Sequence, residues 1–174
     1  MAECKNIMVY VETAEGNPVK VGLEMLSPAK KLADKVTAVV IGGGVADAAK
    51  EVAKAGADQV ICVDSEDYKE FNLDAYAQVL VELVKEENPK AVFVGGTQDG
   101  KDIAPIVAAK CNTGCASDVL DIKAEDGEVI YTCPLYGGTV LEDVKIKTTP
   151  QVATLRSGAF QKVEEPTEGE VVAK

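Results

Sequence analysis

Residues 91–105 constrain the fold of this chain more than any other segment. Four apolar residues, 91–94, run directly into Gly95-Gly96-Thr97, and a helical pattern begins after Gly100. A strand followed by a glycine turn and a helix is the junction at which α/β folds direct backbone N–H groups toward an anion. The segment therefore predicts an α/β fold with a candidate phosphate site where this strand ends.

The first two thirds of the chain repeat this alternation of strand and helix. Near-continuous apolar runs separated by helical patterns of ten or more residues are typical of βαβ units, in which helices cover both faces of a parallel sheet. The strands are expected at 7–11, 36–41, 59–63 and 91–94, and the helices at 22–33, 46–55, 73–86 and 101–110. Right-handed crossovers then give a doubly wound, Rossmann-like core.

The last third has a different pattern, because strand-like runs follow one another without helices between them. They are expected at 119–122, 128–135, 139–147 and 151–155. Asp126-Gly127 and Gly137-Gly138 supply turn signals between them, which predicts an antiparallel extension of the sheet. From residue 163 the sequence is acidic and poor in core residues. We therefore divide the chain into an α/β domain at 1–162 and an acidic linker or tail at 163–174.

Charge and hydropathy exclude several classes of partner. The net charge is −11, from 29 acidic and 18 basic side chains, and no basic patch interrupts the acidic surface, so nucleic-acid binding is not expected. No apolar run approaches the roughly 20 residues that a membrane span requires. The first residues show no secretory pattern, and we expect a cytoplasmic protein with no membrane contact.

The chain contains no histidine, which excludes Ser–His and Cys–His hydrolase mechanisms and a His-based metal site. Its five cysteines form no Cys-x-x-Cys pair, so the zinc-ribbon and thioredoxin interpretations fail. We expect these cysteines to be reduced core residues. The sequence therefore offers no catalytic residue and no metal site.

Two glycine clusters compete as the cradle for a phosphate. Residues 42–44 follow the second expected strand and residues 95–100 follow the fourth, but neither matches the dinucleotide fingerprint or the P-loop. Glycines at such positions are also needed simply to turn the chain tightly into a helix. For 42–44 the tight turn is the favoured interpretation.

The second cluster is the better candidate, because Thr97, Lys101 and a helix N-terminus converge there. Asp99 and Asp102 would oppose a phosphate and are candidate helix caps instead. The candidate nucleotide-binding residues are Gly95, Gly96, Thr97, Gly100 and Lys101.

Arg156 is the only arginine, against seventeen lysines. Its planar guanidinium can hold a carboxylate, a phosphate or backbone carbonyls in a fixed plane, which lysine cannot do. The sequence alone does not decide whether Arg156 makes a specific contact of this kind or an ordinary ion pair.

Five segments carry a resemblance to a known family. Residues 96–105, 107–110 and 113–118 resemble the amino-terminal domain of the electron transfer flavoprotein α subunit, and so do residues 134–138 and 150–160. The resemblance covers nearly the whole chain in order, and the last two segments separate it from the related β subunit. The sequence departs from the family at Lys101 and Ile106, where arginine is common, and at Cys115, where larger apolar residues are usual.

The resemblance implies a Rossmann-like, adenine nucleotide α-hydrolase-like domain of a heterodimeric, FAD-containing electron carrier. Such carriers pass electrons from acyl-CoA dehydrogenases to quinone-linked or ferredoxin acceptors. The family holds FAD in a carboxyl-terminal domain, which we expect to lie outside these 174 residues, and in the β subunit, so we expect no cofactor on this chain alone. The domain would be an electron-carrier platform and not an enzyme.

For the candidate residues, the resemblance implies a degenerate nucleotide cradle at Gly95–Lys101. It also leads us to expect that Tyr136, Gly137 and Arg156 lie at the interface with the β subunit. The alternative is a stand-alone adenine-nucleotide-binding domain of the stress-protein type. Those proteins usually present a Gly-x-x-Gly spacing followed by Gly-Ser or Gly-Thr, which is missing here.

Overall fold

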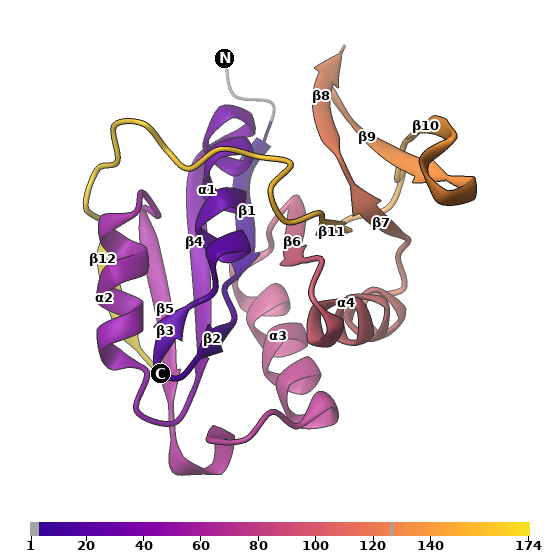
Figure 1. Cartoon of the computed structure of the whole chain (residues 1–174). Coiled ribbons are helices and arrows are strands. Elements are labelled where there is room, and N and C mark those ends of the chain that lie inside the picture. Colours follow the sequence, from indigo (N-terminus) through magenta and orange to yellow (C-terminus); the bar gives the residue numbers. More distant parts are fainter. Residues whose placement is uncertain (1–3, 126) are drawn as a thin grey trace.

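The molecule is built around a seven-stranded sheet whose neighbouring strands all run parallel (Figure 1), in the order β12-β5-β4-β1-β6-β11-β7. The computed structural model describes residues 4–125 and 127–174, so Met1 to Glu3 and Asp126 of the expected Asp126-Gly127 turn lie outside the described residues. The strands are β1 (Cys4–Tyr10), β4 (Ala33–Gly42), β5 (Gln59–Asp64), β6 (Ala91–Gly95), β7 (Cys115–Val119), β11 (Gln151–Leu155) and β12 (Glu170–Ala173).

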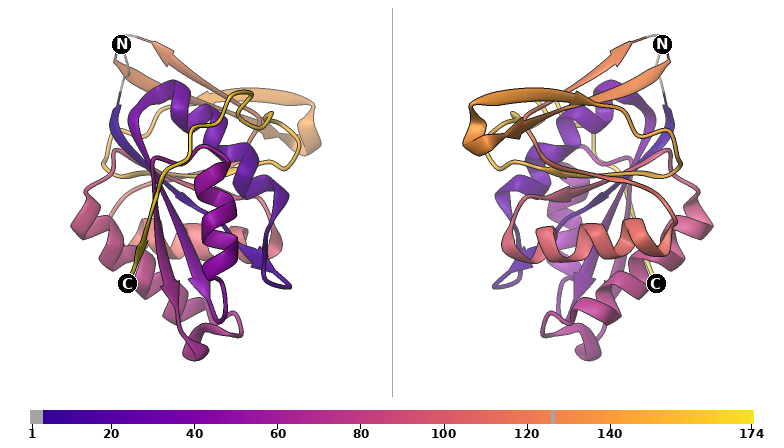
Figure 2. Two further views of the ribbon diagram at one scale, coloured as in Figure 1. Left: turned by 90° about the vertical axis from the view of Figure 1, so that its left-hand side faces the viewer. Right: turned by 90° about the vertical axis from the view of Figure 1, so that its right-hand side faces the viewer.

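Two helices cover each face of the sheet (Figure 2): α1 (Lys20–Leu32) and α2 (Ala46–Lys54) on one, α3 (Leu73–Glu87) and α4 (Gln98–Lys110) on the other. Successive side chains of β1 alternate between two cores, because residues of a strand point to opposite faces. Ile7 and Val9 join the core under α1 and α2, while Met8 and Tyr10 join the core under α3 and α4. The predicted α/β class with helices on both faces is confirmed.

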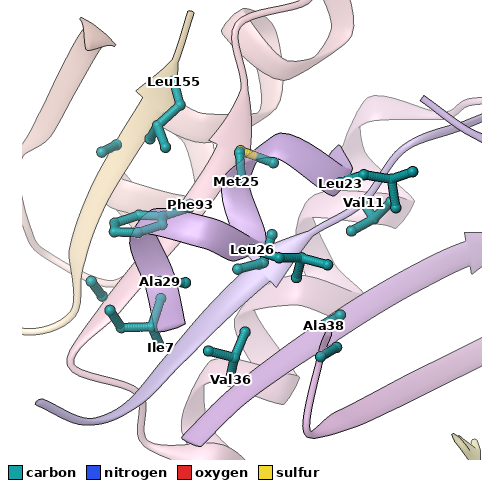
Figure 3. Packing of buried hydrophobic residues seen from close by; sticks show 14 of the residues in the cluster. Ile7, Val11, Leu23, Met25, Leu26, Ala29, Val36, Ala38, Phe93 and Leu155 are labelled. Carbon is teal, nitrogen blue, oxygen red and sulfur yellow. The ribbon is translucent and has the colours of Figure 1, made fainter. Parts of the chain in front are cut away.

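The first core is centred on α1. In Figure 3 the side chains of Leu26 and Ala29 lie among Ile7 of β1 and Phe93 of β6, and all four are fully buried. Apolar residues at successive turns of α1 provide this face, as its sequence pattern predicts. The packing fixes α1 across the strands that carry the candidate site.

The antiparallel strands of the last third are present, but they form a separate sheet with the order β10-β9-β8. Its strands are β8 (Asp121–Glu125), β9 (Glu128–Leu135) and β10 (Val140–Val144), and a short helix, η2 (Tyr136–Gly138), joins the last two. The expected strand at 119–122 is divided between β7 and β8. This small sheet stands at the end of the molecule opposite β12 (Figure 1) and packs Tyr131 edge-on against Phe93, with 6.4 Å between the ring centroids.

The expectation for residues 151–155 was wrong in one respect. They form β11, which is inserted between β6 and β7 in the main sheet and is parallel to both. All five of its residues are buried. A strand buried on both faces belongs inside a helix-covered parallel sheet, whereas the nearby hairpin signals favoured an antiparallel one.

Residues 163–174, expected as a linker or tail, return to the main sheet. The segment passes across the α1 side of the molecule (Figure 2) and ends as β12, which pairs with β5 at the sheet edge. Val171 and Val172 supply a short β-branched run for this pairing. The division of the chain at residue 162 stays a prediction. Within 4–125 and 127–174, no helix is long and apolar enough to cross a membrane.

Candidate functional site

The carboxyl end of β1 is the point at which the strand order reverses. From β1 the chain crosses to β4 on one side, and from β5 it crosses back through α3 to β6 on the other side. Ligands of open α/β sheets bind at such points, outside the carboxyl ends of the strands. A pocket of about 320 Å³ opens here, which we call the switch-point pocket. Its lining includes Tyr10, Glu12, Gly42, Tyr68, Tyr76 and Asp99.

The candidate cradle at Gly95–Lys101 is a helix cap. Thr97 is the N-cap of α4, and its hydroxyl accepts a hydrogen bond from the N–H of Gly100 at 2.9 Å. The helix therefore begins at Gln98, three residues earlier than expected, and Gly100 lies within its first turn. Thr97 takes the capping role that the sequence left to Asp99 or Asp102, since a threonine hydroxyl placed before the first turn satisfies its exposed donors.

The structure brings the five candidate residues together, but it engages three of their N–H groups internally. The N–H of Gly96 donates to the carbonyl of Leu155 at 2.7 Å, and the N–H of Lys101 donates to the carbonyl of Thr97 at 3.0 Å. A Cβ on Gly96 would stand 2.9 Å from the Leu155 oxygen, and one on Gly100 would stand 1.9 Å from the Gly95 oxygen. These glycines permit close packing, and three of the donors that an anion would use already have partners.

Glu12, which the sequence analysis missed, completes this turn. The Thr97 hydroxyl donates to Glu12 Oε1 at 2.6 Å, and this contact joins the end of β1 to the start of α4. Burial raises the pKa of Glu12, the charge of Asp99 raises it further, and the hydrogen bond from Thr97 opposes both. The sequence did contain a signal for Glu12, because a carboxylate directly after an apolar strand is a candidate site residue. Its negative charge disfavours a phosphate at this position.

The other glycine cluster, at 42–44, is also occupied by the protein itself. The N–H of Gly44 donates to Asp64 Oδ1 at 2.7 Å, and Gly43 packs against the backbone of Lys69. Gly44 has a φ of 71°, which glycine adopts without strain. These contacts support the tight-turn interpretation.

Arg156 follows β11 and forms a two-pronged ion pair with Asp118. Its Nε donates to Asp118 Oδ1 at 2.9 Å, and its Nη2 donates to the second carboxylate oxygen. The hydrogen bonds from Arg156 lower the pKa of Asp118, and the charge of the nearby Lys101 lowers it further. Arg156, Asp118 and Lys101 thus form one charged group beside the α4 N-terminus.

Tyr136 and Gly137 lie elsewhere, on η2 at the tip of the small sheet. Tyr136 is 84% exposed, and Leu135, Val140 and Leu141 beside it are also exposed. Four large apolar side chains exposed on one hairpin are unusual for a solvated surface, and exposed apolar patches are typical of contact sites. The structure therefore separates the predicted interface residues into this apolar tip and the charged group that contains Arg156.

Comparison with known proteins agrees with the family resemblance seen in the sequence. A family model described as "Electron transfer flavoprotein domain" matches residues 7–174. The chain is similar to the protein FixB of Clostridium saccharobutylicum, with 37% identity over 170 residues, which cover 94% of this chain and 51% of that protein. It is 36% identical over 169 residues to the electron transfer flavoprotein subunit alpha of Clostridium acetobutylicum, covering 93% of this chain and 50% of that protein.

A third relative is named acryloyl-CoA reductase electron transfer subunit beta, from Anaerotignum propionicum. It is 31% identical over 189 residues, which cover 92% of this chain and 52% of that protein. The chain spans about half the length of the curated relatives it matches.

Proposed function

Because the chain belongs to the electron transfer flavoprotein family, in the part that corresponds to the amino-terminal domain of the α subunit, we propose that it is the structural platform of a heterodimeric electron carrier. In this proposal the carrier accepts electrons from acyl-CoA dehydrogenase-type donors and passes them to quinone-linked or ferredoxin acceptors. One relative is named as an electron transfer subunit of an acryloyl-CoA reductase, which supports electron exchange with an enzyme that acts on an acyl-CoA. The chain itself performs no catalytic step.

The occupied N–H groups at both glycine turns carry this proposal. The pyrophosphate of FAD needs free backbone donors and no facing carboxylate. Here the donors of Gly44, Gly96 and Gly100 are engaged within the protein. Glu12 and Asp99 line the pocket between the two turns. The residues of this chain therefore do not fit FAD, and we assign the flavin to the β subunit and to the second α-subunit domain.

The same observation argues against the alternative of a stand-alone adenine-nucleotide-binding domain. The triphosphate of ATP would face the same engaged donors and the same carboxylates. We also propose a cytoplasmic location, because no disulfide joins the cysteines in the described part of the chain and their thiols suit a reducing compartment.

A flavin count tests the proposal directly. The chain is purified alone, and also after co-expression with a β subunit and the second α-subunit domain, and the flavin absorbance per chain is measured. We expect flavin only in the complete assembly. One flavin per chain on the folded chain by itself, or a large thermal shift with ATP by itself, would contradict the proposal.

A further inference from the structure

The switch-point pocket carries an excess of negative charge that the structure leaves uncompensated. Glu12, Glu15 and Asp99 line it, and Lys69 is the single basic residue in the lining. The Lys69 ammonium already lies 3.5 Å from a carboxylate oxygen of Glu66, outside the lining. The carboxylates influence one another, since the charge of Asp99 contributes to the raised pKa of Glu12. The pocket is therefore suited to a positive ligand and not to a phosphate.

Tyr10 supplies an independent sign of a ligand. Its side chain is 2% exposed and lines the pocket from the end of β1. Across residues 4–125 and 127–174, its hydroxyl has no hydrogen-bond partner within the protein. The ring is buried while the hydroxyl opens onto the pocket, where a ligand can supply the hydrogen-bond partner that the protein does not. Burial and the charges of Glu12, Tyr76 and Asp99 raise its pKa, so the hydroxyl is neutral and has lone pairs to offer.

Aromatic rings form another part of the lining. Tyr76 lies between two further rings, with centroid distances of 5.0 Å to Phe71 and 5.8 Å to Tyr68. The Tyr76 hydroxyl donates to the carbonyl of Tyr68 at 2.6 Å, which fixes the arrangement. Aromatic rings beside carboxylates attract ammonium and guanidinium groups and cover their carbon stems.

We propose that the switch-point pocket binds an organic cation, an ammonium or guanidinium group on a short carbon chain. The cation donates to Glu12 and Asp99 and to the lone pairs of the Tyr10 hydroxyl, and its stem lies against the rings. The volume of about 320 Å³ suits a ligand of this size, since small-molecule sites begin at about 300 Å³. The site is independent of the flavin and goes beyond the platform role.

A calorimetric titration of the full chain at low salt tests this assignment. Agmatine represents a free amine, the peptide Gly-Arg-Gly represents a side chain of a protein partner, and AMP is the anionic comparison. We expect saturable binding of agmatine, of the peptide or of both, and none of AMP. Tighter binding of agmatine identifies a free amine as the ligand, and tighter binding of the peptide identifies a protein side chain.

Three variants locate the binding. Asp99→Asn and Tyr10→Phe each weaken cation binding at least about fivefold, because each removes one partner of the cation. Asp102→Asn, an exposed change of equal charge on the same helix, leaves the affinity unchanged. Thermal unfolding confirms that the variants are folded. Absence of saturable cation binding, tighter binding of AMP, or an equal loss in Asp102→Asn would overturn the proposal.

Discussion

The Thr97 hydroxyl lies 2.6 Å from Glu12 Oε1 and donates to it, joining two residues that are 85 positions apart in the chain. The same hydroxyl oxygen accepts the N–H of Gly100 and caps α4. One side chain thus ties the end of β1 to the turn after β6 and places a carboxylate where the fold would otherwise receive an anion.

Replacing Thr97 removes the helix cap and the donor to Glu12 together. Loss of an N-cap costs about 0.5–2 kcal/mol, and Glu12 also loses a hydrogen-bond partner. We expect Thr97→Val to lower the free energy of unfolding by about 2 kcal/mol in urea denaturation. Thr97→Ser keeps the hydroxyl and serves as the control. Equal stability of the valine variant and the serine variant would contradict the assigned role.

Glu12→Gln keeps an acceptor for Thr97 and removes the charge. The pKa of Glu12 in the folded protein is raised above its ordinary value of 4.5, so the folded state holds this proton more tightly than the unfolded state. The contribution of Glu12 to stability therefore falls as the pH rises from 4.5 through the folded pKa. We expect the glutamine variant to be more stable than the wild-type protein at pH 7.5 and equally stable near pH 4. Urea denaturation at both values measures the difference, and a less stable variant at pH 7.5 would argue against it.

Gly100 has no room for a side chain. A Cβ there would stand 1.9 Å from the Gly95 carbonyl oxygen, and backbone cannot move aside as a flexible side chain can. We expect Gly100→Ala to destabilise the protein by about 1–3 kcal/mol. Gly114→Ala is the matched control, because its Cβ would meet Ile146 at 3.6 Å, an ordinary contact. Thermal unfolding compares the two, and similar melting temperatures would be inconsistent with this account.

The ion pair of Asp118 and Arg156 should be detectable in the titration of Asp118. The hydrogen bonds from Arg156 hold the pKa of that carboxyl below its ordinary value of 3.8. The stabilisation by this pair is therefore present above pH 3.8 and is lost as the pH falls through the folded pKa. NMR titration should show the pKa of Asp118 moving back up in Arg156→Gln. An unchanged pKa in the variant would mean that the pair does not form in solution.

Arg156 uses two of its five N–H groups on Asp118. If the remaining donors reach the β subunit, Arg156→Lys should weaken the heterodimer, although it keeps the charge, because lysine cannot hold two planar contacts at once.

The apolar tip of the small sheet should contribute binding energy to the same heterodimer. We expect Tyr136→Ser and Leu141→Ser each to weaken association with a β subunit by about tenfold or more, because they remove apolar surface that partner binding would bury. Val171→Ser on β12, another exposed apolar residue, is the control. Surface plasmon resonance measures the affinity. Equal effects of all three substitutions would remove the tip from the interface.

The local pattern of apolar residues in the sequence was sufficient to predict most strands of the main sheet. Strands buried on both faces must be apolar at nearly every position, and β4 and β6 are recognisable in the sequence for that reason. The amphipathic repeat of α3 was equally visible. In the structure this helix ends at Asn88, which adopts the left-handed conformation that closes a helix. The sequence pattern places the start of α4 three residues too late, because Gly100 resembles a helix boundary but lies within the first turn.

The sequence by itself determined the class of the fold, the family and the position of the turn at Gly95–Lys101, because each depends on the order and spacing of nearby residues. Only the tertiary structure decided which strand β11 joins, that the chain returns as β12, and that Glu12, Asp64 and Leu155 engage the groups of the glycine turns. These relationships join residues far apart in the chain. They are set by how the strands are ordered across the sheet, and the interactions within each segment leave that order undetermined.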